Sequence, residues 1–556
     1  MKIIKKINKK SIFIFVIILL IGSIAWKLPD NVDYIRIAKV TETFASVYRE
    51  VSLRFIDTIN HEDFIVTGIK SMLKTLDPYT TYIDKNDKNE LDLLLQNQYG
   101  GAGISVFARD SSLFINELLD NYPAKKVGLR IGDKIISIND INLQNSTVEK
   151  MREVIRGTPG GVLKFVIKRG AIPQPISYSL IRELIQAKSI SYSGLLNDST
   201  GYIKLTRFSQ GAPLEFKSAL KELQVKNSIS SLVIDLRDNG GGLLESAVSI
   251  ASNFVPKGSL IVSTKGRDTN DVKYIYTEEV PILKNVKIAV LINKNSASAS
   301  EILAGAIQDL DAGVILGQPS FGKGLVQTLH WIGQNIQLKI TTARYYTPSG
   351  RCIQKYTYDK SGKAIITNDS IQHEFLTTSG RNVKSSGGIL PDSILAVDTS
   401  SFVSQLNRSW VFFDYATLLT SNMNSIPIDF KISNDIANSF FKYVISLPSN
   451  KLPDNFVYKK VKEFETFAKD KNVSNLIINS ISEIKNESIK NINLSLNSNK
   501  DNISRYILRE VYSRFNGTKD RVQLGLIDDN QLQSTIIFLQ SKVNYYSMLH
   551  KDIKQD

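Results

Sequence analysis

The sequence predicts a multidomain α/β protein, and three observations lead to this fold class. The chain has 556 residues, and a folded domain takes roughly 100 to 200 residues, so we expect three or four folded units. Residues 200–396 alternate strand and helix patterns, as an α/β core does. Short β-type runs punctuated by glycine precede this stretch, and helical patterns rich in Asn, Ser and Lys follow it.

The N-terminal segment 1–27 has the pattern of a sequence that addresses a chain to a membrane. Residues 1–10 carry five lysines and no acid, and Ser11 to Trp26 has no charge. A membrane span needs roughly 20 apolar residues, whereas a cleaved signal peptide has a core of about 7 to 15. We expect an uncleaved anchor, with cleavage at Ser23-Ile24-Ala25 as the alternative. Either outcome leaves the lysines in the cytoplasm and exports the rest, so we expect the bulk of the chain in the periplasm. The uncleaved segment would also anchor it to the inner membrane.

Four further regions follow along the chain. Apolar residues at helical spacing predict a helical region over 32–97, with helices that end near Leu76-Asp77-Pro78. We expect a β-rich module over 98–172, an α/β core over 173–396 and a helical region of unknown role over 400–556. The strands expected in the core are GYIKLTRF, SLVIDLR, IAVLIN and GVILG.

Composition excludes several classes of protein. One cysteine, Cys352, excludes an internal disulfide framework and any cysteine-based zinc cluster. No two histidines lie within helical reach of each other, so we expect neither a metal nor another cofactor. The net charge of +15 permits binding to nucleic acid, but the lysines are scattered, so we expect no nucleic-acid partner. The four histidines are His61, His330, His373 and His550.

A serine in a run of small residues is the densest local signal. The segment NSASASEILAGA follows the expected strand KIAVLIN and opens a helix, with Ser298 at the turn. Ser298 and Glu301 have the spacing of a capping box, in which the serine only satisfies backbone donors. The same position also suits a nucleophile, because free N–H groups at a helix N-terminus stabilise an oxyanion.

Two glycine-rich segments carry the other signals. Gly317–Gly324 nearly matches the phosphate-binding loop GxxxxGK[ST], but Gly324 stands where Ser or Thr must hold magnesium, so we disfavour an NTPase. In this loop Lys323 is either a solvated turn residue or a desolvated amine with a lowered pKa, which could act as a general base. The three glycines 240–242 after SLVIDLRDN form either a plain tight turn or an oxyanion hole.

Together these segments resemble the C-terminal processing peptidases, also called tail-specific proteases. The resemblance covers residues 40 to about 396, in the family's order, and residues 98–172 look like the family's PDZ module. It implies a ββα-type α/β peptidase core. The matching segments are LDPYTTYI, LVIDLRDNGGGLL, NKNSASASEILAGAIQD, GQPSFGKGLVQ, ARYYTPSGRCIQ and GGILPD.

The resemblance implies a serine endopeptidase with a Ser-Lys pair. Ser298 would be the nucleophile and Lys323 its base, supported by Gln327. The oxyanion donors would be the backbone N–H groups of Ala299 and Gly241, although Gly240 replaces a residue that is often proline or serine in the family. His330 falls in the expected strand QTLHWIG with no acid placed to orient it, so a Ser-His-Asp triad is the weaker assignment.

The resemblance also implies how substrates are recognised. A PDZ module captures a free C-terminus, and Gly101, Ala102, Gly103 and Ile104 would donate backbone N–H groups to its carboxylate next to an edge strand; the alternative is a bare hairpin turn. The expected partners are proteins with exposed apolar C-termini and, through the N-terminal segment, a membrane; a homo-oligomer is left open. The alternative function is a catalytically silent PDZ scaffold that only binds C-termini.

Overall fold

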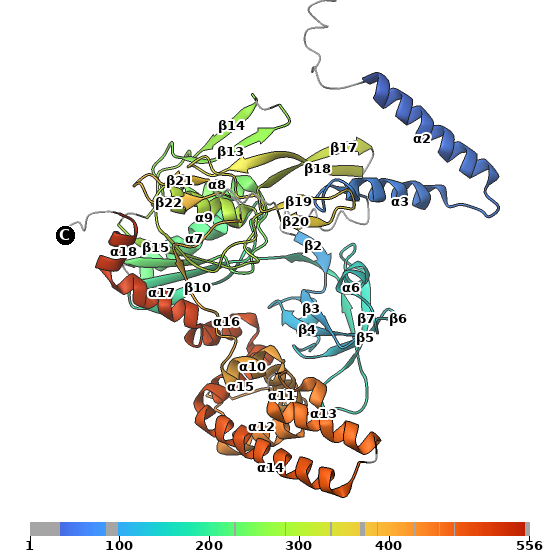
Figure 1. Cartoon of the computed structure of the whole chain (residues 1–556), viewed down its shortest axis with the longest axis vertical. Coiled ribbons are helices and arrows are strands. Elements are labelled where there is room, and N and C mark those ends of the chain that lie inside the picture. The colour runs from blue at the N-terminus through green and yellow to red at the C-terminus, as the bar shows by residue number, and fades with distance from the viewer. Residues whose placement is uncertain are drawn as a thin grey trace, which may run out of the picture. The chain divides into compact units, whose positions relative to one another are not determined.

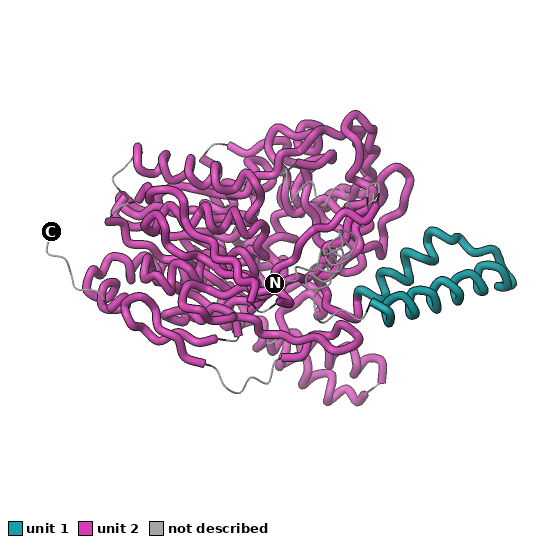
Figure 2. Tube along the Cα trace, turned by 90° about the horizontal axis from the view of Figure 1, so that it is seen from above, with its two compact units in different colours: residues 1–73 teal, residues 74–556 magenta. Residues whose placement is uncertain are grey.

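The computed structural model describes most of the chain as two compact units, residues 1–73 and 74–556 (Figure 2). None of the helices in the described residues is long and apolar enough to cross a membrane. The predicted membrane segment, Ser11 to Trp26, lies outside these residues. The described residues are 34–84, 98–226, 229–268, 270–283, 285–333, 336–366, 373–385, 387–427, 429–454, 456–471 and 473–550.

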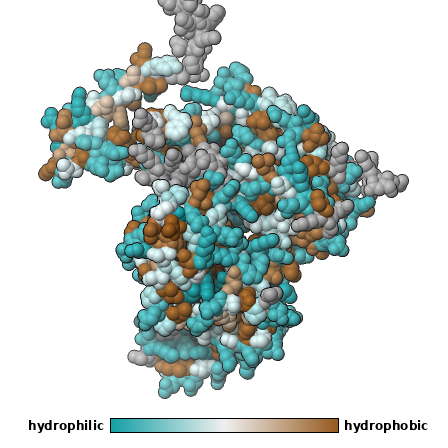
Figure 3. All heavy atoms as spheres, turned by 180° about the vertical axis from the view of Figure 1, so that it is seen from behind, coloured by the Kyte–Doolittle hydropathy of each residue, from teal (hydrophilic) through white to brown (hydrophobic). Residues whose placement is uncertain are grey.

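The first unit contains α2 (Tyr34–Arg54) and all but the last residue of α3 (His61–Lys74), in the region where helices are expected. The side-chain oxygen of Asn60 accepts the N–H groups of Glu62 (3.1 Å) and Asp63 (3.3 Å), which caps α3. Neither helix has a buried residue. In Figure 3 hydrophobic side chains of this unit therefore lie exposed among polar ones.

The β-rich module is an antiparallel sheet with strand order β3-β4-β5-β7-β8, and β6 pairs with β5 (Figure 1). Alternate residues of its strands, such as Phe165 and Ile167, are fully buried in one core. The sheet takes in β8, which lies beyond residue 172. Its elements are β3 (Ile104–Arg109), β4 (Ser112–Leu118), α5 (Pro123–Lys126), β5 (Lys134–Ile138), β6 (Ile141–Asn142), α6 (Val148–Ile155), β7 (Val162–Lys168) and β8 (Ile176–Ile181).

The α/β core is built on a six-stranded sheet with order β10-β11-β12-β15-β16-β23, parallel from β11 onward. Every residue of β12 and β15 is buried, as central parallel strands require, and the four strands expected in the core are present. The elements are β10 (Ile190–Asn197), β11 (Thr200–Leu205), α7 (Ala212–Lys226), β12 (Ser231–Asp235), α8 (Leu244–Ala251), β15 (Lys287–Ile292), α9 (Ala299–Asp309), β16 (Val314–Gly317) and β23 (Ser393–Ile394).

A second sheet adjoins this core. The loop that holds Lys323, residues 318–324, leads into this sheet and is called the lysine loop below. Its order is β1-β18-β13-β14, and β17 pairs with β18. Its strands are β1 (Thr81–Ile83), β13 (Leu260–Gly266), β14 (Val272–Tyr276), β17 (Leu325–Gly333) and β18 (Ile336–Tyr346). Three strand pairs complete the sheets: β2 (Gln98–Gly101) with β9 (Glu183–Gln186), β19 (Tyr356–Tyr358) with β20 (Ala364–Ile366), and β21 (Glu374–Leu376) with β22 (Asn382–Lys384).

The C-terminal region is helical, as expected. Leu532, Leu539 and Tyr545 from its last helices pack against buried residues of the core sheet, Val233 and Leu291 among them. The helices are α10 (Phe402–Arg408), α11 (Val411–Leu419), α12 (Asn434–Ser446), η1 (Ser449–Lys451), α13 (Val457–Asp470), α14 (Asn475–Ser498), α15 (Lys500–Asn516), α16 (Thr518–Ile527), α17 (Asn530–Gln540) and α18 (Lys542–Met548).

The start of α11 docks on the β-rich module. The Trp410 ring stacks on Phe107 with a centroid distance of 4.2 Å and an interplanar angle of 6°. Phe413 is buried within the module's own hydrophobic core. The Arg109 guanidinium pairs with Asp414 at 2.6 Å. The C-terminal region therefore binds both the module and the core.

Two glycines let the module approach α11 closely. A Cβ added at Gly132 would overlap the side chain of Thr417, and one added at Gly170 would overlap Ser421. Both glycines also have a positive φ, 96° and 44°, which other residues rarely adopt. The backbone of the β-rich module therefore contacts the end of α11 and the turn after it directly at Gly132 and Gly170.

Candidate active site

Ser298 lies in a strained turn between β15 and α9. Its φ of 57° and ψ of −114° fall outside the regions that a residue with a side chain normally adopts. The turn is fixed by neighbouring bonds: Ala297 N–H donates to the Asn239 carbonyl (3.0 Å), and the Tyr345 hydroxyl donates to the Ser298 carbonyl (3.3 Å). Strain of this kind persists only where the surroundings enforce it, and it is concentrated at functional sites.

The capping-box arrangement of Ser298 and Glu301 is present. Ser298 N–H donates to the Glu301 carboxylate at 2.8 Å, and Glu301 N–H donates to the Ser298 carbonyl oxygen at 2.8 Å. Because that carbonyl also accepts the Glu301 N–H, this donor has a partner besides the serine hydroxyl. Capping geometry and a reactive hydroxyl are thus compatible at this residue.

The Glu301 carboxylate joins the serine turn to the lysine loop. Its Oε2 accepts from the N–H groups of Ser298 (2.8 Å) and Lys323 (2.9 Å). Its Oε1 accepts from the Ser320 hydroxyl (2.5 Å) and Gly322 N–H (2.6 Å). Burial raises the pKa of Glu301 to about 7, and these hydrogen bonds oppose the rise. The Ser-x-x-Glu spacing predicted a helix cap at Glu301. It did not predict that the same carboxylate also binds the loop that holds Lys323.

The Lys323 amine is held on two sides. Its Nζ donates to Gln327 Oε1 at 2.8 Å and lies 4.2 Å from the centroid of the Tyr79 ring. Gln327 follows on β17, and its Nε2 donates to Thr341 Oγ1 on β18 at 3.1 Å. The pairing of β17 with β18 therefore orients the glutamine that contacts the lysine.

The electrostatic surroundings favour the neutral amine. Burial, above all, and the charge of Lys339 lower the pKa of Lys323, whereas Glu301 and Asp77 raise it, and the net result is a pKa of about 8. A lysine with this pKa is partly neutral near pH 8 and can accept a proton. The loop runs into strand β17 rather than into a helix, unlike a phosphate-binding loop, which opens a helix.

The glycine turn lies against Ser298. A Cβ added at Gly241 would stand 2.6 Å from the Ala297 carbonyl oxygen, 2.9 Å from Ala299 N and 2.9 Å from Ser298 Cβ. With a φ of 100° as well, this position accepts only glycine. Gly241 N–H donates to Asn239 Oδ1 at 2.9 Å, while Ala299 opens α9, where N–H groups lack intrahelical partners.

A buried ion-pair cluster that sequence reasoning missed lies directly before the glycine turn. The Asp235 carboxylate is fully buried and accepts from Arg237 (2.7 Å) and the Tyr202 hydroxyl (2.7 Å). Arg237 also pairs with Asp529, the N-cap of α17, at 2.6 Å. Asp529 belongs to no motif, so no sequence signal pointed to it.

His330 lies on β17, where the strand is expected, and its side chain is exposed. Its Nε2 shares a hydrogen bond with Thr328 Oγ1 at 2.8 Å. Within the described part of the chain no carboxylate makes a hydrogen bond to this ring. A histidine base oriented by an acid is therefore not assembled here.

The residues expected to bind a C-terminus, Gly101 to Ile104, connect β2 to β3. These two strands do not pair with each other, so the segment is not a hairpin turn. The carbonyl of Ala102 accepts Ala124 N–H (3.1 Å), and that of Gly103 accepts Leu119 N–H (2.9 Å). In the described residues β3 pairs only with β4, so its other edge is open to an added strand.

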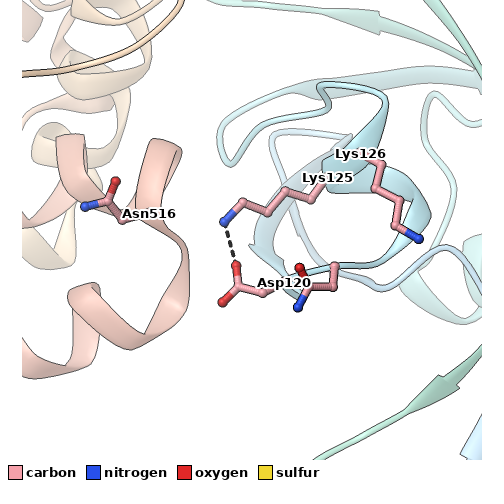
Figure 4. Close-up of a pocket in the computed structure, with 5 residues that line it drawn as sticks. Asp120, Lys125, Lys126 and Asn516 are labelled. Carbon is pink, nitrogen blue, oxygen red and sulfur yellow. Dashed lines mark hydrogen bonds and ion pairs between the residues drawn. The ribbon is translucent and has the colours of Figure 1, made fainter.

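A pocket of about 400 Å³ lies away from these residues, where the β-rich module faces the end of α15. Figure 4 shows the Lys125 amine directed at Asp120, with Asn516 opposite them. The lysine and the aspartate pair at 2.5 Å. Two of the charged side chains that line the pocket, Lys125 and Asp120, therefore already pair with each other. The pocket is lined by Asp120, Asn121, Lys125, Lys126 and Asn516.

Three family models match this chain. Residues 91–168 match a PDZ domain, residues 199–361 match peptidase family S41, and residues 402–539 match the C-terminal helical domain of a probable PDZ-protease. The chain is also similar to a solved photosystem II D1 C-terminal processing protease, with 22% identity, a TM-score of 0.35 and coverage of 58% of this chain and 91% of that one.

Curated relatives agree with these matches. A carboxy-terminal-processing protease of Bartonella bacilliformis is 34% identical over 314 residues, which cover 56% of this chain and 72% of the relative. The carboxy-terminal processing protease CtpB of Bacillus subtilis is 32% identical over 57% of this chain and 66% of its own length. The chain therefore belongs to the carboxy-terminal processing proteases, serine-type peptidases of family S41.

Proposed function

We propose that this protein is an exported serine endopeptidase that cleaves proteins near exposed apolar C-termini, with Ser298 as nucleophile and Lys323 as general base. The observation that carries the proposal is the buried Glu301 carboxylate, which accepts N–H groups from both residues. A shared buried anchor keeps the serine turn and the lysine loop in register. The lowered pKa of the lysine supports the same assignment.

In the proposed reaction the neutral Lys323 amine takes the proton of the Ser298 hydroxyl as its oxygen attacks the scissile carbonyl. Backbone N–H groups of Ala299 and Gly241 would stabilise the oxyanion, for which Gly241 must release Asn239 Oδ1. The lysine ammonium then protonates the leaving amine. Water, deprotonated by the same amine, hydrolyses the acyl-enzyme. Gln327 orients the amine throughout.

The test is incubation of the full chain with an unfolded protein bearing an apolar C-terminal tail, with Ser298→Ala as the control. A fluorophosphonate probe should label the active chain on Ser298, as peptide mass spectrometry would show. We expect cleavage by the parent chain and none by the variant. Binding of the tail without cleavage or labelling would instead support the silent scaffold.

We further propose that the PDZ domain binds the free carboxylate of a substrate through the N–H groups of residues 101–104. The open edge of β3 supports strand addition by the peptide. Amidating the peptide's C-terminus should weaken binding at least tenfold in a fluorescence anisotropy titration. Equal affinity for the acid and the amide would contradict this proposal.

Export is proposed from sequence alone. The lysine-rich start and the uncharged run Ser11 to Trp26 support a single crossing of the inner membrane, with residues 27–556 in the periplasm. Cell fractionation should find the chain with the envelope. A mature N-terminus at Trp26 would replace the anchor with a cleaved signal, and a cytosolic chain would contradict export.

A further inference from the structure

The segment 76–83 presents a fixed aromatic ring to the lysine loop. Asp77 is buried, and its Oδ1 accepts the N–H groups of Tyr79 (2.7 Å) and Thr80 (2.7 Å). The Thr80 hydroxyl donates to Asp77 Oδ2 (3.0 Å) and accepts Thr341 N–H (3.2 Å). Because β1 then pairs with β18, the backbone that carries Tyr79 is anchored by hydrogen bonds on both sides of the residue.

The Tyr79 ring is held at its outer end as well. The Tyr358 hydroxyl donates to the Tyr79 hydroxyl at 3.3 Å, and the two rings meet edge to face with centroids 6.0 Å apart. Lys323 Nζ lies 4.2 Å from the centroid of the Tyr79 ring and 2.8 Å from Gln327 Oε1. The amine is thus enclosed between a ring and an amide oxygen.

We propose that Tyr79 is a positioning residue for the general base, and that its ring face, opposite Gln327 Oε1, holds the Lys323 amine in place. This inference rests on the proposed role of Lys323. An aromatic face attracts an ammonium, more strongly where water is excluded. The ring therefore favours the charged lysine and limits how far burial lowers its pKa.

The other charged groups that face the Lys323 amine do not change when Tyr79 is replaced. They are Lys339 on β18, which lowers the lysine pKa, and Glu301 on α9 and Asp77 before β1, which raise it. Tyr79 itself stays neutral, because burial raises the pKa of its hydroxyl well above the ordinary value. A difference between ring variants therefore reports on the ring.

The first test compares pH profiles of kcat/KM for Tyr79→Leu, which removes the ring, and Tyr79→Phe, which keeps it. In Tyr79→Leu the midpoint of the acid limb should move down by about 0.5 to 1 pH unit, with kcat falling more than tenfold and KM nearly unchanged. Tyr79→Phe should keep the parental midpoint. An unshifted or upward-shifted Tyr79→Leu, or equal shifts in both variants, would overturn the proposal.

The second test reads the amine without activity. In a Ser298→Ala background, competitive acetylation with acetic anhydride and mass spectrometry of the Lys323 peptide give the fraction of neutral amine at each pH. The same downward shift should appear in Tyr79→Leu, or in Tyr79→Met if the leucine variant unfolds. An unchanged labelling midpoint would refute the role of Tyr79. A shifted labelling midpoint together with an active Lys323→Ala enzyme would instead refute Lys323 as the base while leaving the ring contact intact.

Discussion

At the scale of single residues, the half-buried amine of Lys323 determines the pH dependence we expect. An ammonium cannot accept the serine proton, so activity should rise with pH through the lysine pKa of about 8. The measurement is kcat/KM for a fluorogenic peptide between pH 6 and 10. A profile that is already flat below about pH 7 would contradict a lysine base.

Replacing the proposed residues should separate the Ser-Lys pair from a histidine mechanism. Ser298→Ala and Lys323→Ala should each lower kcat by at least about 1,000-fold without unfolding the chain. His330→Ala should keep most of the activity, since its exposed ring contacts only Thr328 among the hydrogen bonds described above. Loss of activity in His330→Ala, with the fold intact by circular dichroism, would exclude the Ser-Lys pair.

The buried carboxylate of Glu301 should make stability fall as pH rises. Its pKa of about 7 in the folded chain exceeds the ordinary 4.5, so the folded state binds more protons between these values. The stabilisation from the bound proton is complete below about pH 4.5 and is lost as pH rises through 7, a change of roughly 3 kcal/mol. Urea unfolding at pH 5 and pH 8 measures most of this change.

Glu301→Gln is the matched variant for this measurement. It removes the titrating group, so the change in free energy of unfolding between pH 5 and pH 8 should shrink by about that amount. The variant should be less stable at pH 8, where Glu301 is ionised, because an amide cannot accept all four hydrogen bonds of the carboxylate. Equal pH dependence in both chains would show that Glu301 does not titrate in this range.

At the scale of elements, the cap of α17 is tied to the strand that precedes the glycine turn. Asp529→Asn should keep the cap, since Asn also accepts Leu532 N–H, but weaken the pair with Arg237. We expect a loss of about 1 to 2 kcal/mol in the free energy of unfolding. Glu279→Gln, which breaks the exposed pair with Lys217, is the control and should cost less than about 0.5 kcal/mol. Equal costs would contradict a stabilising role for the pair of Asp529 with Arg237.

The same elements show what sequence could and could not predict. The apolar residues of β12 and β15 follow one another without alternation, as expected for strands with both faces buried, and this pattern can be read from a short stretch of sequence. The segments around Ser298 and Lys323 stand out in the sequence because glycines and small residues surround them, but only the resemblance to the peptidase family gave the two residues their expected roles. The pair of Arg237 with Asp529 spans 292 residues and follows no periodicity, so only the folded chain reveals it. The ring of Tyr79 over Lys323 was missed for the same reason.

At the scale of the whole molecule, the helical region whose role the sequence left open is attached to both the PDZ domain and the peptidase core. The stacked rings of Trp410 and Phe107 should contribute to the first attachment. In a double-mutant cycle with both residues changed to Ala, we expect a coupling of about 0.5 to 1.5 kcal/mol in urea unfolding. Additive losses would show that the stacking contributes nothing beyond burial.

The close approach at Gly132 and Gly170 offers a way to loosen that attachment with a single methyl group. Neither glycine touches Ser298 or Lys323, and each lies where α11 leaves no room for a Cβ. Alanine at either position would press Thr417 or Ser421 outward and would also strain the module's backbone, because both positions have a positive φ, so the contact between the PDZ domain and α11 should weaken. Measuring peptide binding and peptide cleavage in such variants would show whether the two activities depend on this contact between the PDZ domain and the helical region.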